Sequence, residues 1–217
     1  MERQAYLQSL IDRSQYPGEY AKYDTQYGGL KEVVGWMWWD INLYTSAVTT
    51  AIAAFTTLKA TLNLSNMTQA GQFASPQAFF LRAIRVRPMI PPYSTTAAAT
   101  GNIQTGAIDD MHQLVEHGVL QFTIGQKNYG QWPLWVLPAG GGVMPFMQTG
   151  DIDVVIQYAN NGAQDARVVY TLTKPLFIAP QINFRVDLLW PAGALTLNAG
   201  NPNIWVGLDG DLVRPVQ

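Results

Sequence analysis

The two histidines of the chain are the natural candidates for metal or acid–base chemistry, because imidazole titrates nearest to neutral pH. His112 and His117 lie near Asp109, Asp110 and Glu116 in a segment with helical periodicity. Five residues apart on a helix, the two imidazoles point about 140° away from each other and cannot share a metal ion. His112 and Glu116, at i and i+4, supply two ligands, fewer than zinc takes. We therefore expect no metal site and no cofactor here.

Hydrolytic chemistry has no recognisable motif in this sequence. The chain contains no Gly-x-Ser-x-Gly element and no closely spaced histidine pair of the cupin kind. It also has no cysteine, which excludes thiolate metal sites, disulfides and thiol nucleophiles. A glycosidase-type carboxylate pair stays open, because its separation is set in three dimensions, although solvated turn acids are the simpler interpretation. The acids concerned are Asp151, Asp153, Asp187, Asp209 and Asp211. We expect the protein not to be an enzyme.

The aromatic residues near the N-terminus indicate contact with another surface. Trp36, Trp38 and Trp39 are three of the seven tryptophans and fit either a core beneath a sheet or the anchors of a subunit interface. Residues 14–32 mix tyrosines with Pro17 and three glycines, which is typical of an extended segment lying on a neighbour. The tyrosines are Tyr16, Tyr20, Tyr23 and Tyr27. The sequence predicts that these aromatic residues form an interface.

Arg85 and Arg87 are the basic pair with a definite predicted geometry. Two positions apart in a strand, they share a face, opposite Ile84 and Val86. Such a pair fits contact with nucleic acid or with carboxylates of a neighbouring subunit. It also fits a solvated face that charge keeps soluble. These alternatives stay open.

The overall composition limits the classes of partner. Charged residues make up 13% of the 217 residues, against a usual share of roughly 25%, and the formal net charge is -2. Nothing in this balance favours free nucleic acid as a ligand. The N-terminus lacks the apolar core of a signal peptide, and the apolar stretch 36–58 is interrupted by polar residues. We expect neither a signal peptide nor a transmembrane segment.

Alternation of apolar and polar residues predicts strands over much of the chain, most clearly at 182–190. Asp209-Gly210 is a hairpin signal, so residues 211–216 are expected to return antiparallel to 203–208. The remaining strands are expected at 57–64, 80–86, 120–124, 129–137, 152–158 and 168–172. A row formed by Phe80, Ile84 and Val86 is expected to be buried. This pattern predicts an all-β protein of about eight strands.

Two helices are expected beside these strands. Residues 2–13 have amphipathic helical spacing, and residues 108–117 form one short helix that interrupts the strands and stops at Gly118. We expect residues 1–45 to be an N-terminal arm with an aromatic segment, largely outside the sandwich. Residues 46–217 are expected to form a single domain.

A jelly-roll β-sandwich with one short inserted helix and an N-terminal arm fits this order of elements better than an immunoglobulin-like sandwich. Strands alternate with long connections and tight turns, and no βαβ rhythm is present. The chain is also about twice the roughly 100 residues of an immunoglobulin domain. The sequence therefore predicts two sheets with Greek-key connections.

The C-terminal half resembles the jelly-roll capsid proteins of bacterial viruses. The resemblance lies in the patterns of residues 118–125, 132–138 with glycines 140–142, 182–191 and 204–215. It covers about residues 79–217. It implies a capsid or capsid-associated subunit, present in many copies, whose N-terminal arm clamps its neighbours.

We therefore expect a structural virion protein of a bacteriophage, made in the host cytoplasm, that acts by self-assembly into a virus shell. Its partners would be copies of itself in a homo-oligomer and other virion proteins, with indirect contact with packaged nucleic acid. Two alternatives remain within binding functions: a receptor-binding virion protein, and a carbohydrate-binding module that stacks sugars on Trp132, Trp135 or Trp205. A third alternative is an enzyme with an unrecognised carboxylate pair.

Overall fold

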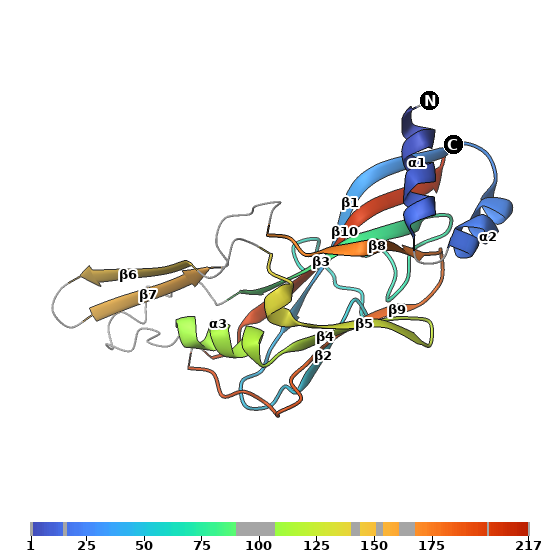
Figure 1. The fold of residues 1–217 in the computed structure, drawn as a ribbon. Helices are drawn as coiled ribbons and strands as arrows, with labels where there is room; N and C mark the ends of the chain where they lie inside the picture. Colours follow the sequence, from blue (N-terminus) through green and yellow to red (C-terminus); the bar gives the residue numbers. More distant parts are fainter. Residues whose placement is uncertain are drawn as a thin grey trace.

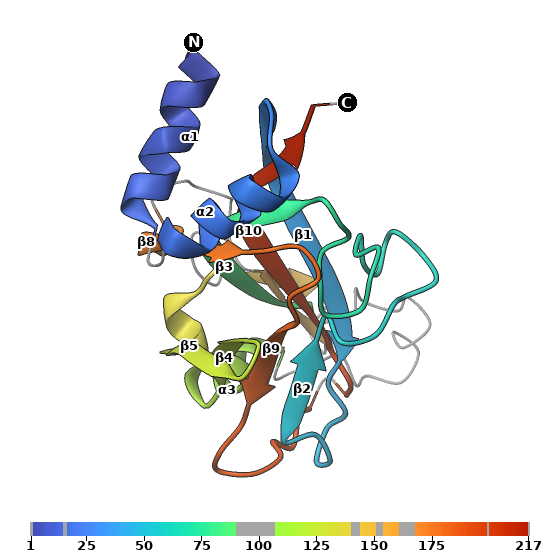
Figure 2. The same ribbon diagram turned by 90° about the vertical axis from the view of Figure 1, so that its right-hand side faces the viewer.

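A computed structural model describes residues 2–14, 17–89, 107–139, 144–150, 154–160, 168–198 and 200–216. The protein is mostly β and forms a sandwich of two antiparallel four-stranded sheets (Figures 1 and 2). Sheet A contains, in spatial order, β1 (Lys31–Leu43), β10 (Asn203–Pro215), β3 (Ala78–Met89) and β8 (Thr171–Ile178). Sheet B contains, in spatial order, β2 (Ala51–Ala54), β9 (Phe184–Leu189), β4 (Val119–Ile124) and β5 (Lys127–Pro133). The β-rich fold class expected from the alternating rows is confirmed at this level.

The strand pairs of the sandwich are nested along the chain. β1 pairs with β10, β2 with β9, β3 with β8, and β4 with β5. The first strand of the eight thus pairs with the last, the second with the seventh, and so on inward. Two further pairings, β10 with β3 and β9 with β4, complete the sheets.

The remaining elements lie around the sandwich. Between β5 and β8 the chain forms the short helix η2 (Leu134–Val136) and a ribbon of β6 (Met144–Gly150) and β7 (Val154–Asn160). Figure 1 shows this ribbon to one side of the sandwich, beyond α3 (Ala107–Glu116). Helices α1 (Glu2–Arg13) and α2 (Pro17–Tyr27) lie at the other end of the molecule, near the C-terminal end of β10 (Figure 2). None of the helices in the described ranges is long and apolar enough to cross a membrane.

The main core fills the space between the two sheets. Sheet A contributes side chains such as Ile84 and Leu208, and sheet B contributes Leu120, Phe122 and Val186. These five are at most 1% exposed. Burial of apolar side chains from both layers is what holds the sheets together, at about 25 cal/mol for each Å² removed from water. The inward row predicted at 182–190 is confirmed for Phe184, Val186, Leu188 and Trp190, which enter this core, whereas Ile182 at its start is exposed.

A second apolar cluster lies on the outer face of sheet A. Phe80, Phe177 and Val213 point away from the main core and pack against Tyr20 and Tyr23 of α2. The ring centroids of Tyr20 and Phe177 are 5.5 Å apart in an edge-on arrangement, which favours aromatic pairs. This second cluster therefore joins the N-terminal helices to the sandwich of the same chain.

A β-bulge in β3 explains why Phe80 faces outward. Gly210 pairs with Leu81 and Asp209 with Ala83, so Arg82 is an extra residue on β3. Because side chains alternate along a strand, one extra residue reverses the alternation beyond it. All three residues of the predicted row are buried as expected, but Phe80 lies in the cluster on the outer face of sheet A, whereas Ile84 and Val86 lie in the main core.

The expected N-terminal arm ends earlier than residue 45. Residues 31–43 form β1, which pairs with β10 along its whole length, so the aromatic segment is part of sheet A. Residues 17–27, expected to be extended, form α2 instead, because Tyr20 and Tyr23 bury one face of a helix against the sheet. The helix predicted at 2–13 is confirmed as α1, and the helix predicted at 108–117 is confirmed as α3.

One predicted strand and one predicted turn are wrong. The predicted strand at 57–64 is a loop, and the nearest strand is β2, which is shorter and earlier. The predicted hairpin at Asp209-Gly210 is absent, because β10 runs straight through both residues between β1 and β3. Gly210 satisfies a close approach of two strands rather than a turn, since a Cβ there would lie 2.0 Å from the carbonyl oxygen of Phe80.

Candidate interaction surface

The loop between β2 and β3 lies along the free edge of β1. The backbone N–H of Ile41 donates to the carbonyl of Leu64 (2.8 Å), and the N–H of Asn66 donates to the carbonyl of Trp39 (3.3 Å). The N–H of Trp39 also donates to Oδ1 of Asn66 (2.7 Å). These bonds satisfy backbone groups that an edge strand would otherwise expose to another chain. The loop therefore occupies the position of a missing neighbouring strand.

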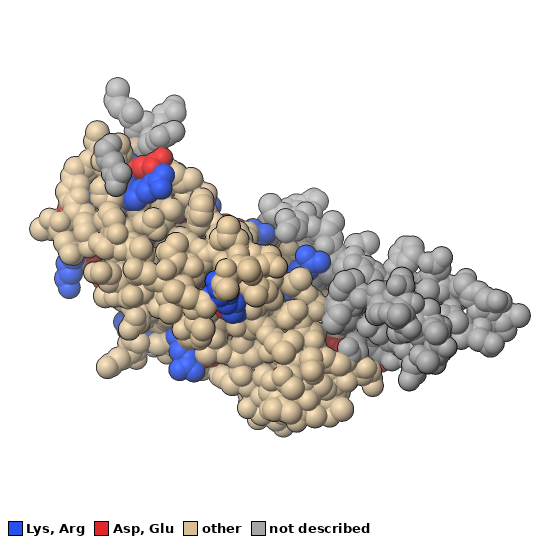
Figure 3. Space-filling model, turned by 180° about the vertical axis from the view of Figure 1, so that it is seen from behind, with Lys and Arg blue, Asp and Glu red and all other residues tan. Residues whose placement is uncertain are grey.

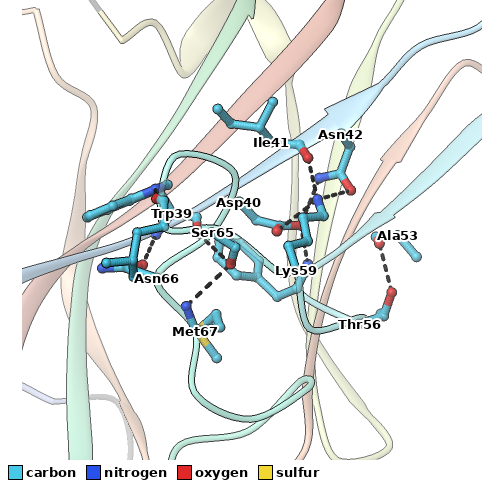
Figure 4. A network of polar contacts seen from close by, with 12 residues as sticks. Trp39, Asp40, Ile41, Asn42, Ala53, Thr56, Lys59, Ser65, Asn66 and Met67 are labelled. Carbon is cyan, nitrogen blue, oxygen red and sulfur yellow. Dashed lines mark hydrogen bonds and ion pairs between the residues drawn. The ribbon is translucent and has the colours of Figure 1, made fainter.

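A buried ion pair fixes this loop to β1 (Figure 4). The carboxylate of Asp40 is 1% exposed, and its Oδ1 lies 2.9 Å from Nζ of Lys59. Its Oδ2 accepts hydrogen bonds from the backbone N–H of Phe55 and from Nδ2 of Asn42, each 2.8 Å long. Nζ of Lys59 also donates to Oδ1 of Asn42 (2.9 Å) and to the carbonyl of Ile41. The buried carboxylate thus has a cation beside Oδ1 and two hydrogen-bond donors at Oδ2, and these contacts offset the cost of its burial.

The loop presents leucines to the solvent from this fixed frame. Leu62 is 76% exposed and Leu58 is 52% exposed, and Leu64 is also exposed. The indole N–H of Trp39 donates to the carbonyl of Leu62 (3.2 Å), and Leu43 is exposed at the end of β1. We call Leu43, Leu58, Leu62, Leu64 and the half-buried Trp39 the leucine surface. Fixed apolar side chains in water are typical of a surface that another molecule covers.

Sequence reasoning missed the leucines of this surface. Their alternation with polar residues favoured a strand with Leu58, Leu62 and Leu64 in the core, yet the side chains are exposed. Asn63, Ser65 and Asn66 follow within a few positions, and residues of these types favour turns. That cluster was the available signal for a loop.

The structure separates the predicted interface residues into two groups. Tyr20, Tyr23 and Trp38 are at most 6% exposed and pack inside their own chain. The prediction that they meet a neighbour is therefore wrong for the folded subunit. The same burial raises the pKa of the Tyr20 hydroxyl to about 12. Trp36 is exposed on β1 beside Trp38, and Trp39 belongs to the leucine surface. Both stay candidates.

The other two tyrosines of the predicted interface are Tyr27 and Tyr16. Tyr27 is half-buried, and its hydroxyl lies 3.0 Å from the hydroxyl of Ser75. Tyr16 lies outside the described residues.

The arginine pair lies on the outer face of sheet A, opposite the buried Ile84 and Val86, as the alternation predicted. Arg85 is half-buried, with Nη2 2.5 Å from Oδ2 of Asp209. Arg87 is exposed. Arg85 therefore already has an intrachain carboxylate, whereas the contact of Arg87 with a partner stays a prediction.

The other candidate sites are dispersed. Nδ1 of His112 lies 3.6 Å from Oε1 of Glu116 on the solvent side of α3, and within the described ranges no three potential ligands meet at a metal-binding distance. Asp187 and Asp209 are each paired with an arginine, and so is Asp211. Asp151 and Asp153 lie outside the described residues.

The tryptophans proposed for sugar stacking are divided among elements. Trp132 lies on β5 and packs against the main core, whereas Trp205 lies on β10 in the other sheet. Trp135 is 61% exposed on η2. No observation thus groups the three indoles into one stacking face.

The surface carries few charges. Figure 3 shows one face on which lysines, arginines and acids are scattered and separated by broad uncharged areas. This agrees with the low share of charged residues, 13%, in the whole chain. Contact with a similar surface therefore buries little charge, which lowers the desolvation cost of association.

Comparison with known proteins adds no relative. No protein-family model, no curated protein and no solved structure matches the chain.

Proposed function

We propose that this protein is a jelly-roll subunit that works by self-association, as a structural protein of a virus shell. The nested pairing of strands supports the jelly-roll topology. An antiparallel ribbon in which the first strand pairs with the last, folded over into two layers, produces this order of strands. Sheet A then holds the first, eighth, third and sixth strands, and sheet B holds the second, seventh, fourth and fifth.

The leucine surface is the observation that carries self-association. A single exposed leucine needs no explanation, but here a buried ion pair holds several of them beside β1. Burying one such side chain against a partner contributes about 1.5–3 kcal/mol. A second copy presents the same surface, so two copies can cover each other's leucines in an isologous contact.

The viral setting rests on the resemblance of the C-terminal half to capsid proteins of bacterial viruses. The charge-poor surface supports a role in which most of the subunit is covered by neighbours (Figure 3). On this proposal the protein is located in the virion, and its partners are further copies and other virion proteins. Assembly is then its activity, with no catalytic step.

Substitution of Leu62 by Glu tests the role of the leucine surface. Because Leu62 is 76% exposed, the variant is expected to fold normally. Loss of its apolar contact and burial of a carboxylate should raise the protein concentration needed for assembly by about tenfold or more. Size-exclusion chromatography with light scattering measures the mass of the wild type and the variant at matched concentrations.

Leu30→Glu is the matched control, because Leu30 is 68% exposed just before β1. Nine residues of extended strand place it about 30 Å from Trp39. It should assemble like the wild type. Equal masses for Leu62→Glu and the wild type would contradict this use of the leucine surface.

A further inference from the structure

A hollow of about 370 Å³ lies between α1 and the outer face of sheet A, on the side of β3 and β8. Helix α1 lines it with Tyr6 and Arg13, and β3 lines it with Arg82 and Arg85. The hydroxyl-bearing Thr173 of β8 also lines it. Three arginines from two elements thus line one hollow, in a chain with few charges.

Two of these arginines are partly neutralised by aspartates of β10. Nε of Arg82 lies 3.0 Å from Oδ2 of Asp211, and Nη2 of Arg85 lies 2.5 Å from Oδ2 of Asp209. The hydroxyl of Tyr6 donates to Asp211 and lies 3.2 Å from each of its oxygens. In the described part of the chain, Arg13 has no carboxylate partner, so three positive charges face two negative ones.

Several N–H donors around the hollow have no acceptor within the described ranges. Nε of Arg85 is buried and unbonded. Arg82 uses Nε for its aspartate, which leaves the N–H groups of its two Nη atoms. Arg13 adds a complete guanidinium fork from the last turn of α1. The N–H groups of the exposed Arg82 and Arg13 are therefore the donors available to a ligand that accepts charge-assisted hydrogen bonds.

We propose that this hollow binds a phosphate group. A tetrahedral anion offers oxygens in three directions at once, which matches donors that arrive from α1 and from two positions of β3. A planar carboxylate can satisfy one fork but not all three. The exposed Arg87, two residues beyond Arg85 on the same face, extends the positive charge towards a longer phosphate-bearing chain. The phosphate is supplied either as the free ion or by a nucleic-acid backbone.

Binding of two probes to the full-length protein distinguishes the free ion from the nucleic-acid backbone. The measurement does not require that the protein assembles, so its outcome is separate from the test of the proposed function. The probes are inorganic phosphate and a short single-stranded DNA without terminal phosphates, each titrated by calorimetry at low salt. Saturable binding of phosphate alone identifies a site for the free ion. Saturable binding of DNA that inorganic phosphate displaces identifies a site for the backbone.

Arg13→Gln is the test variant, because Arg13 is exposed and lacks an ion-pair partner in the described chain. It should weaken binding of the effective probe by about tenfold or more, the usual contribution of a charge-assisted hydrogen bond. Arg13→Lys, which keeps the charge, should recover part of the affinity. Arg185→Gln is the control, because it removes an exposed arginine paired with Asp187, remote from the hollow in sequence and on the other sheet.

The control should change affinity less than twofold. Failure of the wild type to bind either probe would overturn the proposal. Equal weakening by Arg13→Gln and Arg185→Gln would also overturn it, because binding would then follow net charge alone.

Discussion

Gly210 lies at the point where β10 meets the bulge of β3. Its backbone is extended, and a Cβ at this position would lie 2.0 Å from the carbonyl oxygen of Phe80 and 2.9 Å from the ring of Phe79. The first contact is to backbone, which cannot move aside without shifting a central strand. Glycine is therefore required by the approach of two strands, and the bulge depends on it.

Gly210→Ala is expected to destabilise the fold by an amount at the upper end of about 1–3 kcal/mol, the usual cost of overpacking. Gly35→Ala, on the neighbouring β1 with no atom within 4 Å of its added Cβ, should cost less than a third of that. Urea unfolding followed by tryptophan fluorescence measures both. Equal stability of the two variants would mean that the bulge does not bring β3 this close to β10.

Asp211 gives a pH dependence with a definite sign. Burial raises the pKa of this carboxyl above its ordinary value, although Arg82 and the hydroxyl of Tyr6 act in the opposite direction. A carboxyl that holds its proton more tightly when folded contributes stability below its unfolded pKa and loses that contribution as the pH rises through its folded pKa. Its contribution to the free energy of unfolding should therefore fall as the pH rises above about 4.

Comparison with Asp211→Asn isolates this contribution. The unfolding free energy of the wild type minus that of Asp211→Asn should decrease between the ordinary carboxyl pKa and neutral pH. Thermal unfolding at a series of pH values gives the difference. An increase over the same range would show that Arg82, rather than burial, controls the pKa of Asp211.

At the scale of elements, the N-terminal helices behave as part of the fold. Tyr20 and Tyr23 cover Phe80, Phe177 and Val213 on the outer face of sheet A. Nζ of Lys31 donates to the carbonyls of Tyr27 and Gly28, and so ties the end of α2 to the start of β1. These contacts join α2 and the residues that follow it to all four strands of sheet A.

Removal of residues 1–29 is therefore expected to expose an apolar face and reduce stability, rather than merely impair assembly. Tyr23→Ala should reproduce part of the loss, about 3 kcal/mol, because it empties the centre of the cluster. Lys22→Ala, at the exposed neighbouring position, is the control. Binding of a dye that fluoresces on exposed apolar surface measures the exposure, and urea unfolding measures the loss of stability. If the truncated protein were as stable as the full chain, the helices would not contribute to the stability of the sandwich, which would contradict this prediction.

The sequence predicts the strands that lie in the main core better than it predicts their neighbours. In β9 and in the first half of β10, each inward position is apolar, so period-two alternation identifies these strands. The same alternation at 57–64 is misleading, because the turn-favouring residues Asn63, Ser65 and Asn66 mark a loop there and Leu62 remains in solvent. The bulge at Arg82 and the burial of Asp40 depend on partners that are distant in sequence.

The candidate surface could be predicted only in part for the same reason. The sequence could indicate that Trp36 and Trp39 are available to a partner. It could not indicate that Trp38 between them is buried, because that burial depends on Phe73 and on the opposite sheet. The pairing of Arg85 with Asp209 is also set by the register of β3 against β10. Tertiary packing thus determines which of the conspicuous side chains remain available to a partner.

At the scale of the whole molecule, the nested ribbon places the strand at the C-terminal end of the chain between β1 and β3. Completion of sheet A therefore requires most of the chain, and contacts of long sequence separation slow folding. The helices cover part of the outer face of sheet A, whereas the leucine surface is exposed and the chain carries few charges. The proposed packing against further copies rests on these features.

Sedimentation velocity of the purified wild-type protein over a wide range of concentrations tests this central claim most directly, with electron microscopy of the fastest fraction. A self-associating shell subunit should shift from subunits to large species as the concentration rises, and the large species should be regular in size. Leu62→Glu should move that transition to higher concentration, and Leu30→Glu should not. A single monomeric boundary at every concentration would contradict the account, and so would irregular aggregates that both variants form as readily as the wild type.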